Sequence, residues 1–199
     1  MTKTTSPPTT RLRRLAPADA SAYRALMLNA YEREPDAFTS TAAERAVLPR
    51  AWWESRLSSD AAAWEIVMGA FRGPHLVGAV GLTFELRTKV RHKVTLFGMY
   101  VSPVARKTGI GRLLVEASLA LAAGRAGIRV VQLTVTQGNV AAIALYEGCG
   151  FKEFGVEPMA ILAGDRSLSK VHMWYDIPQT GRPRCDPSGA SGGRRPGHG

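Results

Sequence analysis

A short loop with two glycines is the first place in this sequence where residue types and spacing suggest chemistry. Gly109 and Gly111 lie between an apolar run that ends at Val101 and a segment with helical periodicity. Backbone N–H groups at a helix start lack partners within the helix and carry partial positive charge, which favours bound phosphate. Glycine lets the backbone approach such an anion closely. Three cations surround the loop: Arg106, Lys107 and Arg112.

The glycine spacing excludes two common nucleotide-binding loops. A Walker A loop requires GxxxxGK followed by Ser or Thr, which this loop lacks. A dinucleotide-binding GxGxxG loop requires a third glycine where the chain has Leu114. The loop therefore indicates phosphate binding of another class, and glycines that serve only a tight turn are the alternative.

A second segment, residues 134–151, carries a pattern of Asn, Ala, Leu-Tyr and Gly-Phe after a short apolar strand. The pattern is formed by Asn139, Ala142, Leu145, Tyr146, Gly150 and Phe151. The earlier loop matches Q/R-x-x-G-x-G/A through Arg106, Gly109 and Gly111. With both patterns in this order and at this spacing, the chain resembles the GCN5-related N-acetyltransferase (GNAT) superfamily over about residues 63–177.

The resemblance implies acetyl-CoA as the cosubstrate, bound between two parallel strands that splay apart, residues 96–101 and 130–135. Backbone groups of the first strand are expected to bind the pantetheine arm, and N–H groups of residues 107–112 the pyrophosphate. Gly98 is the expected position of a bulge in that strand. The implied coenzyme-binding residues are Met99, Tyr100, Val101, Arg106, Lys107, Thr108, Gly109, Ile110, Gly111, Arg112, Asn139, Ala142 and Tyr146.

Acyl transfer from a thioester to an amine sets three chemical requirements. The amine must be neutral, so a base accepts its proton; Glu85 is the tentative candidate, with a solvated glutamate or a water chain as alternatives. The carbonyl oxygen gains negative charge, and the Met99 N–H is the expected donor to it. The leaving thiolate needs a proton, and Tyr146 matches the family's general acid. A tyrosine that only packs against the sheet is the other interpretation.

Three further features leave alternatives open. Lys107 stands where the family commonly has glycine, and its side chain is expected either to pair with phosphate or to point to solvent. The basic segment 87–93 could attract an acidic acceptor or the coenzyme 3′-phosphate, or be a solvated turn. The aromatic residues in the helical segments either line an apolar amine pocket or belong to the core: Tyr31, Phe38, Trp52 and Trp53.

The elements that must position these residues follow from hydrophobic periodicity. Strands are expected at 11–15, 63–71, 76–86, 94–101, 130–135, 151–156 and 171–177. Helices are expected from Pro17 to about Arg33, over 42–58 with a break at Pro49, over 109–125, and from Asn139 to Glu147. An antiparallel meander followed by strand–helix–strand–helix predicts an α/β mixed sheet of six or seven strands flanked by helices, the GNAT-like fold.

Composition and charge bound the class of protein. The chain has 199 residues and a net charge of +10. Residues 1–14 contribute +4, residues 178–199 contribute +3, and the body only +3, which argues against a nucleic-acid groove. Two separated cysteines and four scattered histidines predict no metal site. We expect a disordered N-terminus over 1–10, one acetyltransferase domain over 11–177, and a disordered Gly/Pro/Arg tail over 178–199.

These observations predict an acetyl-CoA-dependent N-acetyltransferase that acts by direct transfer to a primary amine of a small molecule or a protein. The sequence does not name the acceptor. No apolar run reaches the length of a membrane span and no secretory signal is recognisable, so a cytoplasmic location without a membrane partner is expected. The resemblance leaves a homodimer open. The rival interpretations are a non-catalytic CoA-binding module and a basic nucleic-acid-binding protein.

Overall fold

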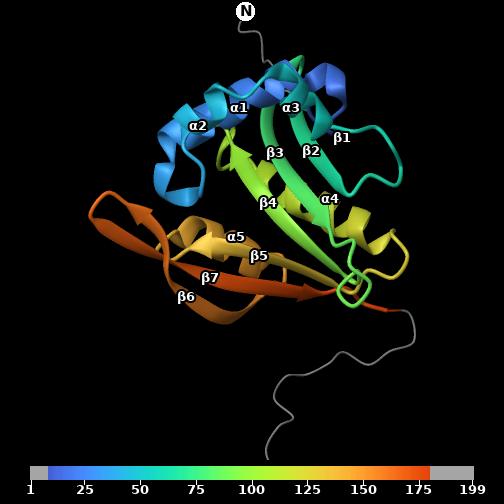
Figure 1. Cartoon of the computed structure of the whole chain (residues 1–199). Helices are drawn as coiled ribbons and strands as arrows, with labels where there is room; N and C mark the ends of the chain where they lie inside the picture. The colour runs from blue at the N-terminus through green and yellow to red at the C-terminus, as the bar shows by residue number, and fades with distance from the viewer. Residues whose placement is uncertain (1–8, 180–199) are drawn as a thin grey trace, which may run out of the picture.

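A seven-stranded mixed sheet forms the centre of the computed structural model, which describes residues 9–179 (Figure 1). The strand order is β1-β2-β3-β4-β5-β7-β6. The strands are β1 (Thr10–Arg14), β2 (Glu65–Arg72), β3 (His75–Phe84), β4 (Lys93–Val101), β5 (Val130–Thr136), β6 (Lys152–Ala163) and β7 (Arg166–Asp176). The mixed α/β sheet predicted from the sequence is confirmed.

Strands β1 to β4 pair antiparallel in sequence order, and short connections join β2 to β3 and β3 to β4. The only parallel pair among the described strands is β4 with β5. Strand β7 then pairs antiparallel with β5 and with β6. The last two strands are much longer than the predicted 151–156 and 171–177, since the chain between them continues as one hairpin that turns at Gly164.

Strand β4 carries a bulge and then leaves its parallel neighbour. In the β3–β4 pairing, Ala79 is opposite Tyr100 and Gly81 is opposite Phe97. An advance of two residues along β3 therefore corresponds to an advance of three residues along β4. The extra residue falls at Gly98, whose φ of 59° is the left-handed conformation that glycine adopts readily. The pairing of β4 with β5 covers only residues 93–95 and 130–132, so the two strands diverge beyond it. The predicted bulge and splay are both confirmed.

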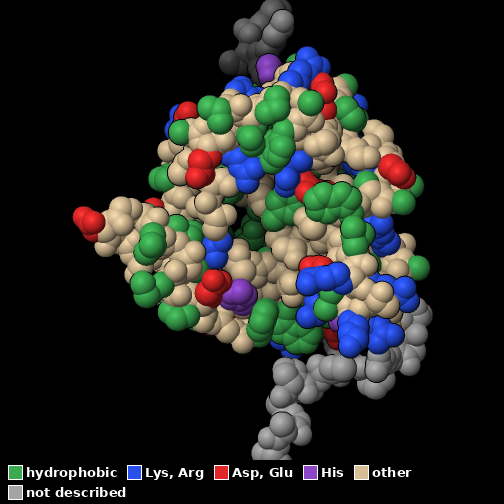
Figure 2. Space-filling view, viewed as in Figure 1, with side chains coloured by type: hydrophobic (Ala, Val, Ile, Leu, Met, Phe, Trp, Pro, Cys, Tyr) green, Lys and Arg blue, Asp and Glu red, His purple; other side chains and the backbone are tan. Residues whose placement is uncertain are grey.

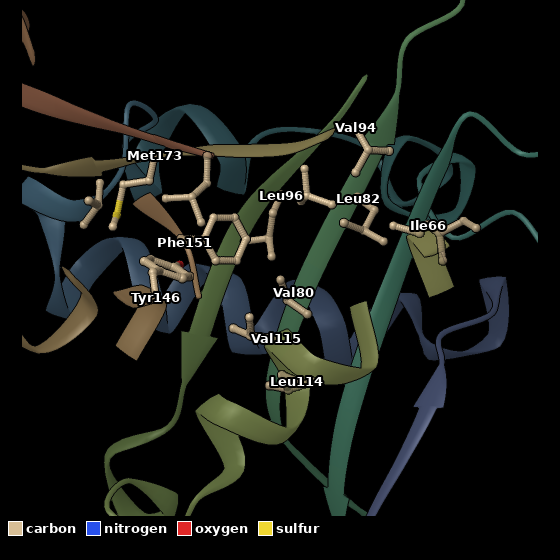
Figure 3. Close-up of a cluster of buried hydrophobic side chains, with 14 of the residues drawn as sticks. Ile66, Val80, Leu82, Val94, Leu96, Leu114, Val115, Tyr146, Phe151 and Met173 are labelled. Atoms are coloured by element: carbon tan, nitrogen blue, oxygen red, sulfur yellow. The ribbon is translucent and has the colours of Figure 1, made fainter. Parts of the chain in front are cut away.

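Helices cover both faces of the sheet (Figure 1). One face carries α1 (Ala20–Arg33), α2 (Ala42–Ala46) and α3 (Arg50–Ser55), the last two separated by Pro49 as predicted. The other carries α4 (Ile110–Ala123) and α5 (Val140–Gly148). Each face buries its own core. Figure 3 shows part of the α4–α5 core, where Leu114 and Val115 of α4 lie below Val80 and Leu82 of β3.

The predicted domain limits fall at β1 and just after β7, whereas most of the segments 1–10 and 178–199 lie outside the described residues. No helix within residues 9–179 combines the length and apolarity needed to cross a membrane.

Candidate active site

The glycine loop lies directly between β4 and α4, as the sequence indicated. It passes through a 3-10 helix, η3 (Pro103–Ala105), and reaches Gly109, which stands before α4 with φ of 82°. Lys107 is also left-handed, with φ of 60°, which is unusual for a residue with a Cβ atom. A left-handed residue on either side of Thr108 turns the chain sharply into the helix.

The backbone N–H groups of this turn are free to bind an anion. None of the residues in the range 9–179 accepts a hydrogen bond from the N–H groups of residues 107–112. The first bond of the helix runs from the Leu113 N–H to the Gly109 carbonyl at 3.0 Å. A Cβ atom at Gly109 would have no neighbour within 4 Å, so open space lies beside this backbone. Unpaired donors beside open space at a helix N-terminus form a site for phosphate.

The cationic side chains of the loop differ in whether they already have hydrogen-bond or ion-pair partners. Arg106 donates to the Val101 carbonyl at 2.9 Å and pairs with Glu34 at 2.8 Å. Arg112 donates to the Gly148 carbonyl at 2.8 Å. Lys107 has no ion-pair partner among the described residues. Of the three cations, Lys107 is therefore the one whose charge is not already engaged within this part of the chain.

An open groove of about 640 Å³ runs from this turn along the splayed edge of β4 toward α5. Most of the residues predicted to bind the coenzyme line it: Met99, Tyr100, Val101, Arg106, Lys107, Gly109, Ile110, Gly111, Arg112, Asn139 and Ala142. Glu34 and Ala37, which the sequence did not indicate, also line it, together with Phe38, which was considered only as an amine-pocket or core residue. The tertiary fold brings this segment, just after α1, to the groove, and no local sequence pattern predicts that it lies there.

Contacts between distant elements hold the rim of the groove. The 3-10 helix η2 (Pro35–Ala37) is fixed from two sides, because Thr136 donates to the Asp36 carbonyl at 2.7 Å and Arg166 pairs with the Asp36 carboxylate at 3.2 Å. Gly111 brings α4 close to α5, since a Cβ atom there would lie 3.2 Å from Leu145. Figure 2 shows the molecule hollowed between the α1–α3 cover and the β5–β7 half of the sheet.

Two predicted coenzyme-binding side chains do not line the groove. Thr108 donates its hydroxyl hydrogen to the Ala105 carbonyl at 2.7 Å and accepts from Arg72 at 2.7 Å, so it braces the turn. Tyr146 is buried, with its ring edge-on to Phe151 (Figure 3). Burial raises the pKa of the Tyr146 phenol, and a smaller contribution comes from Cys149.

Tyr146 nevertheless lies on the side of α5 that faces the groove. It is one helical turn beyond Ala142, which lines the groove, so both lie on the same side of α5. Asn139 caps this helix by accepting from the Ala142 N–H at 3.2 Å, as predicted for the helix start. The cap fixes the direction of α5, and the raised pKa extends the range over which the phenol is protonated further above neutral pH.

The tentative base is not brought to this place. Glu85 pairs in the backbone with Lys93, six residues before Met99 on β4, which is roughly 20 Å at about 3.3 Å per residue. Its carboxylate accepts from Arg87 at 3.1 Å in the basic hairpin. Glu85 does not line the groove, so we correct this expectation: the hairpin geometry keeps Glu85 at the other end of the strand.

A second cavity lies on the α1–α3 side of β4. It has a volume of about 140 Å³ and shares Phe38 with the groove, while Gly98 and Met99 stand on either side of the bulge between them. The four aromatic residues considered from the sequence all line it. Trp53 does so while also belonging to the core at 1% exposure, so for this residue the pocket and core interpretations both hold.

Comparison with known proteins agrees with this geometry. A family model described as the acetyltransferase (GNAT) family matches residues 25–151. The [Ribosomal protein bS18]-alanine N-acetyltransferase of Escherichia coli strain K12 is 39% identical over 70 residues, which are 35% of this chain and 47% of that protein. The chain thus spans about half the length of the curated relatives it matches.

Solved structures are similar over most of the chain. A GNAT-family acetyltransferase from Streptococcus pneumoniae has a TM-score of 0.77 and 27% identity, covering 85% of this chain and 100% of that one. A ribosomal-protein-alanine N-acetyltransferase from Brucella melitensis has a TM-score of 0.69 and 27% identity, covering 84% of this chain and 99% of that one.

Proposed function

Because the chain belongs to the GNAT family of acetyltransferases, we propose that it transfers an acetyl group from acetyl-CoA to an amine acceptor. The observation that carries this proposal is the row of unpaired N–H groups over residues 107–112 at the mouth of a groove. A diphosphate bridging a pantetheine arm and a nucleotide suits this arrangement, because the N–H groups and Lys107 meet its charge. The free edge of β4 beyond residue 95 offers backbone partners to the amide groups of pantetheine.

The chemistry proposed for this chain needs a donor for the carbonyl oxygen and a proton for the leaving thiolate. The bulge at Gly98 turns the backbone between the groove and the second cavity, and the Met99 N–H is the proposed donor to the oxyanion. Tyr146 is the proposed acid, supported by its position one turn from Ala142, which lines the groove. No carboxylate is assigned as base; a water chain accepts the amine proton in this proposal.

We place the acceptor on the far side of the bulge, in the second cavity. An amine that enters from the second cavity reaches a thioester in the groove across Gly98 and Phe38. The relatives from Escherichia coli and Brucella melitensis are N-acetyltransferases for an alanine of a ribosomal protein, which makes a protein amine one acceptor to test. A small-molecule amine is the other.

A matched pair of glycine variants tests the proposal. Gly109 and Gly127 have φ of 82° and 84° and no neighbour within 4 Å of an added Cβ, so alanine is strained similarly at both. We expect acetyl-CoA to raise the melting temperature of the wild type and of Gly127→Ala, and to raise that of Gly109→Ala much less. Free thiol released on addition of amines then reports acetyl transfer.

Two outcomes separate the rival functions. A melting-temperature shift without acetyl transfer to any amine leaves a non-catalytic CoA-binding module. No shift with acetyl-CoA in the wild type contradicts the proposed function altogether.

A further inference from the structure

The second cavity combines aromatic walls with two guanidinium groups. Arg45 of α2 and Arg56, just after α3, both line it, and the carbon at the centre of each guanidinium lies 4.8 Å from the Trp52 ring centroid. Arg56 also lies 5.4 Å from the Phe97 ring centroid. The negative face of Trp52 is therefore already used by cations of the protein itself. An acceptor group with positive charge gains little from these rings and is repelled by the arginines.

The charges in and behind the cavity do not cancel. Arg56 pairs with Glu65 of β2 at 2.8 Å, and the Glu65 side chain is only 5% exposed. Arg45 donates to the Ser40 hydroxyl at 2.8 Å and has no carboxylate within ion-pair distance among residues 9–179. One positive charge is thus left over beside apolar walls, where it acts more strongly than in water.

The hydrogen-bonding capacity open to a ligand comes from Arg45. The Trp53 indole N–H and Glu65 Oε1 also lack hydrogen-bond partners among the described residues, but both atoms are buried and present no surface to the cavity. The Arg45 guanidinium lines the cavity and donates only to Ser40 among those residues, so it has further N–H groups that match an oxyanion.

We propose that this cavity binds a carboxylate of the acceptor, with Arg45 as the residue that determines specificity, so that the substrate is an amine that also carries an acid. This inference rests on the proposed acetyl transfer. The volume of about 140 Å³ is enough for a carboxylate with a few methylene groups. Such a group occurs in a free amino acid or in an acidic residue beside a peptide N-terminus.

The position of the cavity adds a geometric reason. A carboxylate held by Arg45 leaves the rest of the acceptor to extend toward Phe38, which lines both the cavity and the groove. The acid is thus held on one side of the bulge, and the amine is left to approach the thioester from that side.

The test compares charged and uncharged acceptors in full-length protein. L-glutamate is paired with L-glutaminamide, in which both carboxylates are replaced by amides, and the peptide amide Ala-Glu with Ala-Gln, so that the two arms separate a free amino acid from a peptide N-terminus. We expect kcat/KM for the carboxylate member of at least one pair to be about tenfold higher or more. Arg45→Gln removes that preference, whereas Arg45→Lys keeps part of it because the charge remains.

Arg50→Gln is the matched control, because Arg50 is a neighbouring exposed arginine paired with Glu54 that does not line the cavity. It should keep the preference, and the KM for acetyl-CoA should be unchanged in all variants. Equal use of carboxylates and amides by the wild type, or an unchanged preference in Arg45→Gln, overturns the inference and leaves acetyl transfer intact.

A binding experiment decides the matter even if none of these amines is acetylated. Glutarate contains the carboxylates without the amine, and glutaramide is its uncharged counterpart. In the presence of CoA, glutarate should raise the melting temperature of the wild type but not of Arg45→Gln, and glutaramide should raise neither. No shift with glutarate overturns the inference, while failure of acetyl-CoA to bind contradicts the proposed function instead.

Discussion

Arg106 and Glu34 form an ion pair of 2.8 Å that joins the loop before α4 to the end of α1, and both residues line the groove. Each side chain is about two-fifths exposed, so the pair itself contributes little to stability. We expect the ion pair to affect coenzyme binding instead. Glu34 places a negative charge beside the proposed diphosphate site and competes for Arg106.

Removal of this carboxylate should therefore strengthen coenzyme binding. We expect Glu34→Gln to bind acetyl-CoA about twofold to fivefold more tightly, since Arg106 becomes free to meet phosphate, and the gain should shrink as salt is raised. Glu54→Gln is the control, because Glu54 makes a similar exposed pair with Arg50 away from the groove. Isothermal calorimetry measures both; weaker binding by Glu34→Gln contradicts the prediction.

We predict that Lys107 lowers the stability of the fold through its backbone conformation and strengthens coenzyme binding through its positive charge. At φ of 60°, a residue with a Cβ atom is strained, and glycine at this position removes the strain. We expect Lys107→Gly to raise the free energy of unfolding by about 1 kcal/mol and to weaken acetyl-CoA binding severalfold. Lys107→Ala loses the same charge but keeps the strain. Equal stability of the two variants in urea unfolding would show that the backbone conformation is not the cause.

Tyr146 is predicted to affect turnover rather than coenzyme affinity. We expect Tyr146→Phe to lower kcat by about a hundredfold, the usual order for loss of a general acid, with the KM for acetyl-CoA almost unchanged. Tyr175→Phe is the control, because Tyr175 also contacts the Phe151 ring, with centroids 5.6 Å apart. Steady-state rates at saturating acetyl-CoA measure both variants.

The pH profile gives the same prediction a second readout. Burial raises the pKa of Tyr146 above that of an exposed tyrosine, so the phenol stays protonated throughout the neutral and mildly alkaline range. The wild-type kcat should therefore show no decline from loss of this proton below about pH 10. A tyrosine-dependent decline near neutrality, absent in Tyr146→Phe, would contradict the assignment.

Local sequence patterns predicted much of the site because its backbone geometry depends on residues that are close together in the chain. The turn at residues 107–112, the cap at Asn139 and the bulge at Gly98 each depend on residues adjacent in sequence. Glycine and asparagine fix the backbone at such points whatever packs around them. The loop, the cap and the bulge are therefore recognisable from the amino-acid sequence alone.

The long hairpin of β6 and β7 was only half predicted. Strand periodicity reports a face buried against a core, and β6 is largely exposed, including apolar residues such as Phe154 and Met159. Its pairing comes from β7, the other arm of the same hairpin, rather than from a core beneath it. Without a buried face, residues 157–163 show no pattern that marks a strand.

The charges of the second cavity, unlike its aromatic residues, could not be predicted for a related reason. Arg45, Arg56 and Glu65 belong to three different segments, and only the tertiary fold places their charges together. One signal was present, since Glu65 is a charged residue within the apolar run at the start of β2. A buried carboxylate in such a run requires a cationic partner, but the sequence does not say which of the chain's many arginines supplies it.

The central claim, that the backbone of residues 107–112 binds the coenzyme diphosphate, is tested most directly by amide chemical shifts. ¹⁵N-labelled protein is titrated with acetyl-CoA and, separately, with pantetheine, which lacks the diphosphate. Acetyl-CoA should shift the amide resonances of Lys107 to Arg112 strongly, and pantetheine should leave them nearly unchanged while moving those of Met99 and Val101. If acetyl-CoA binds and the resonances of residues 107–112 stay where they were, the claim is contradicted.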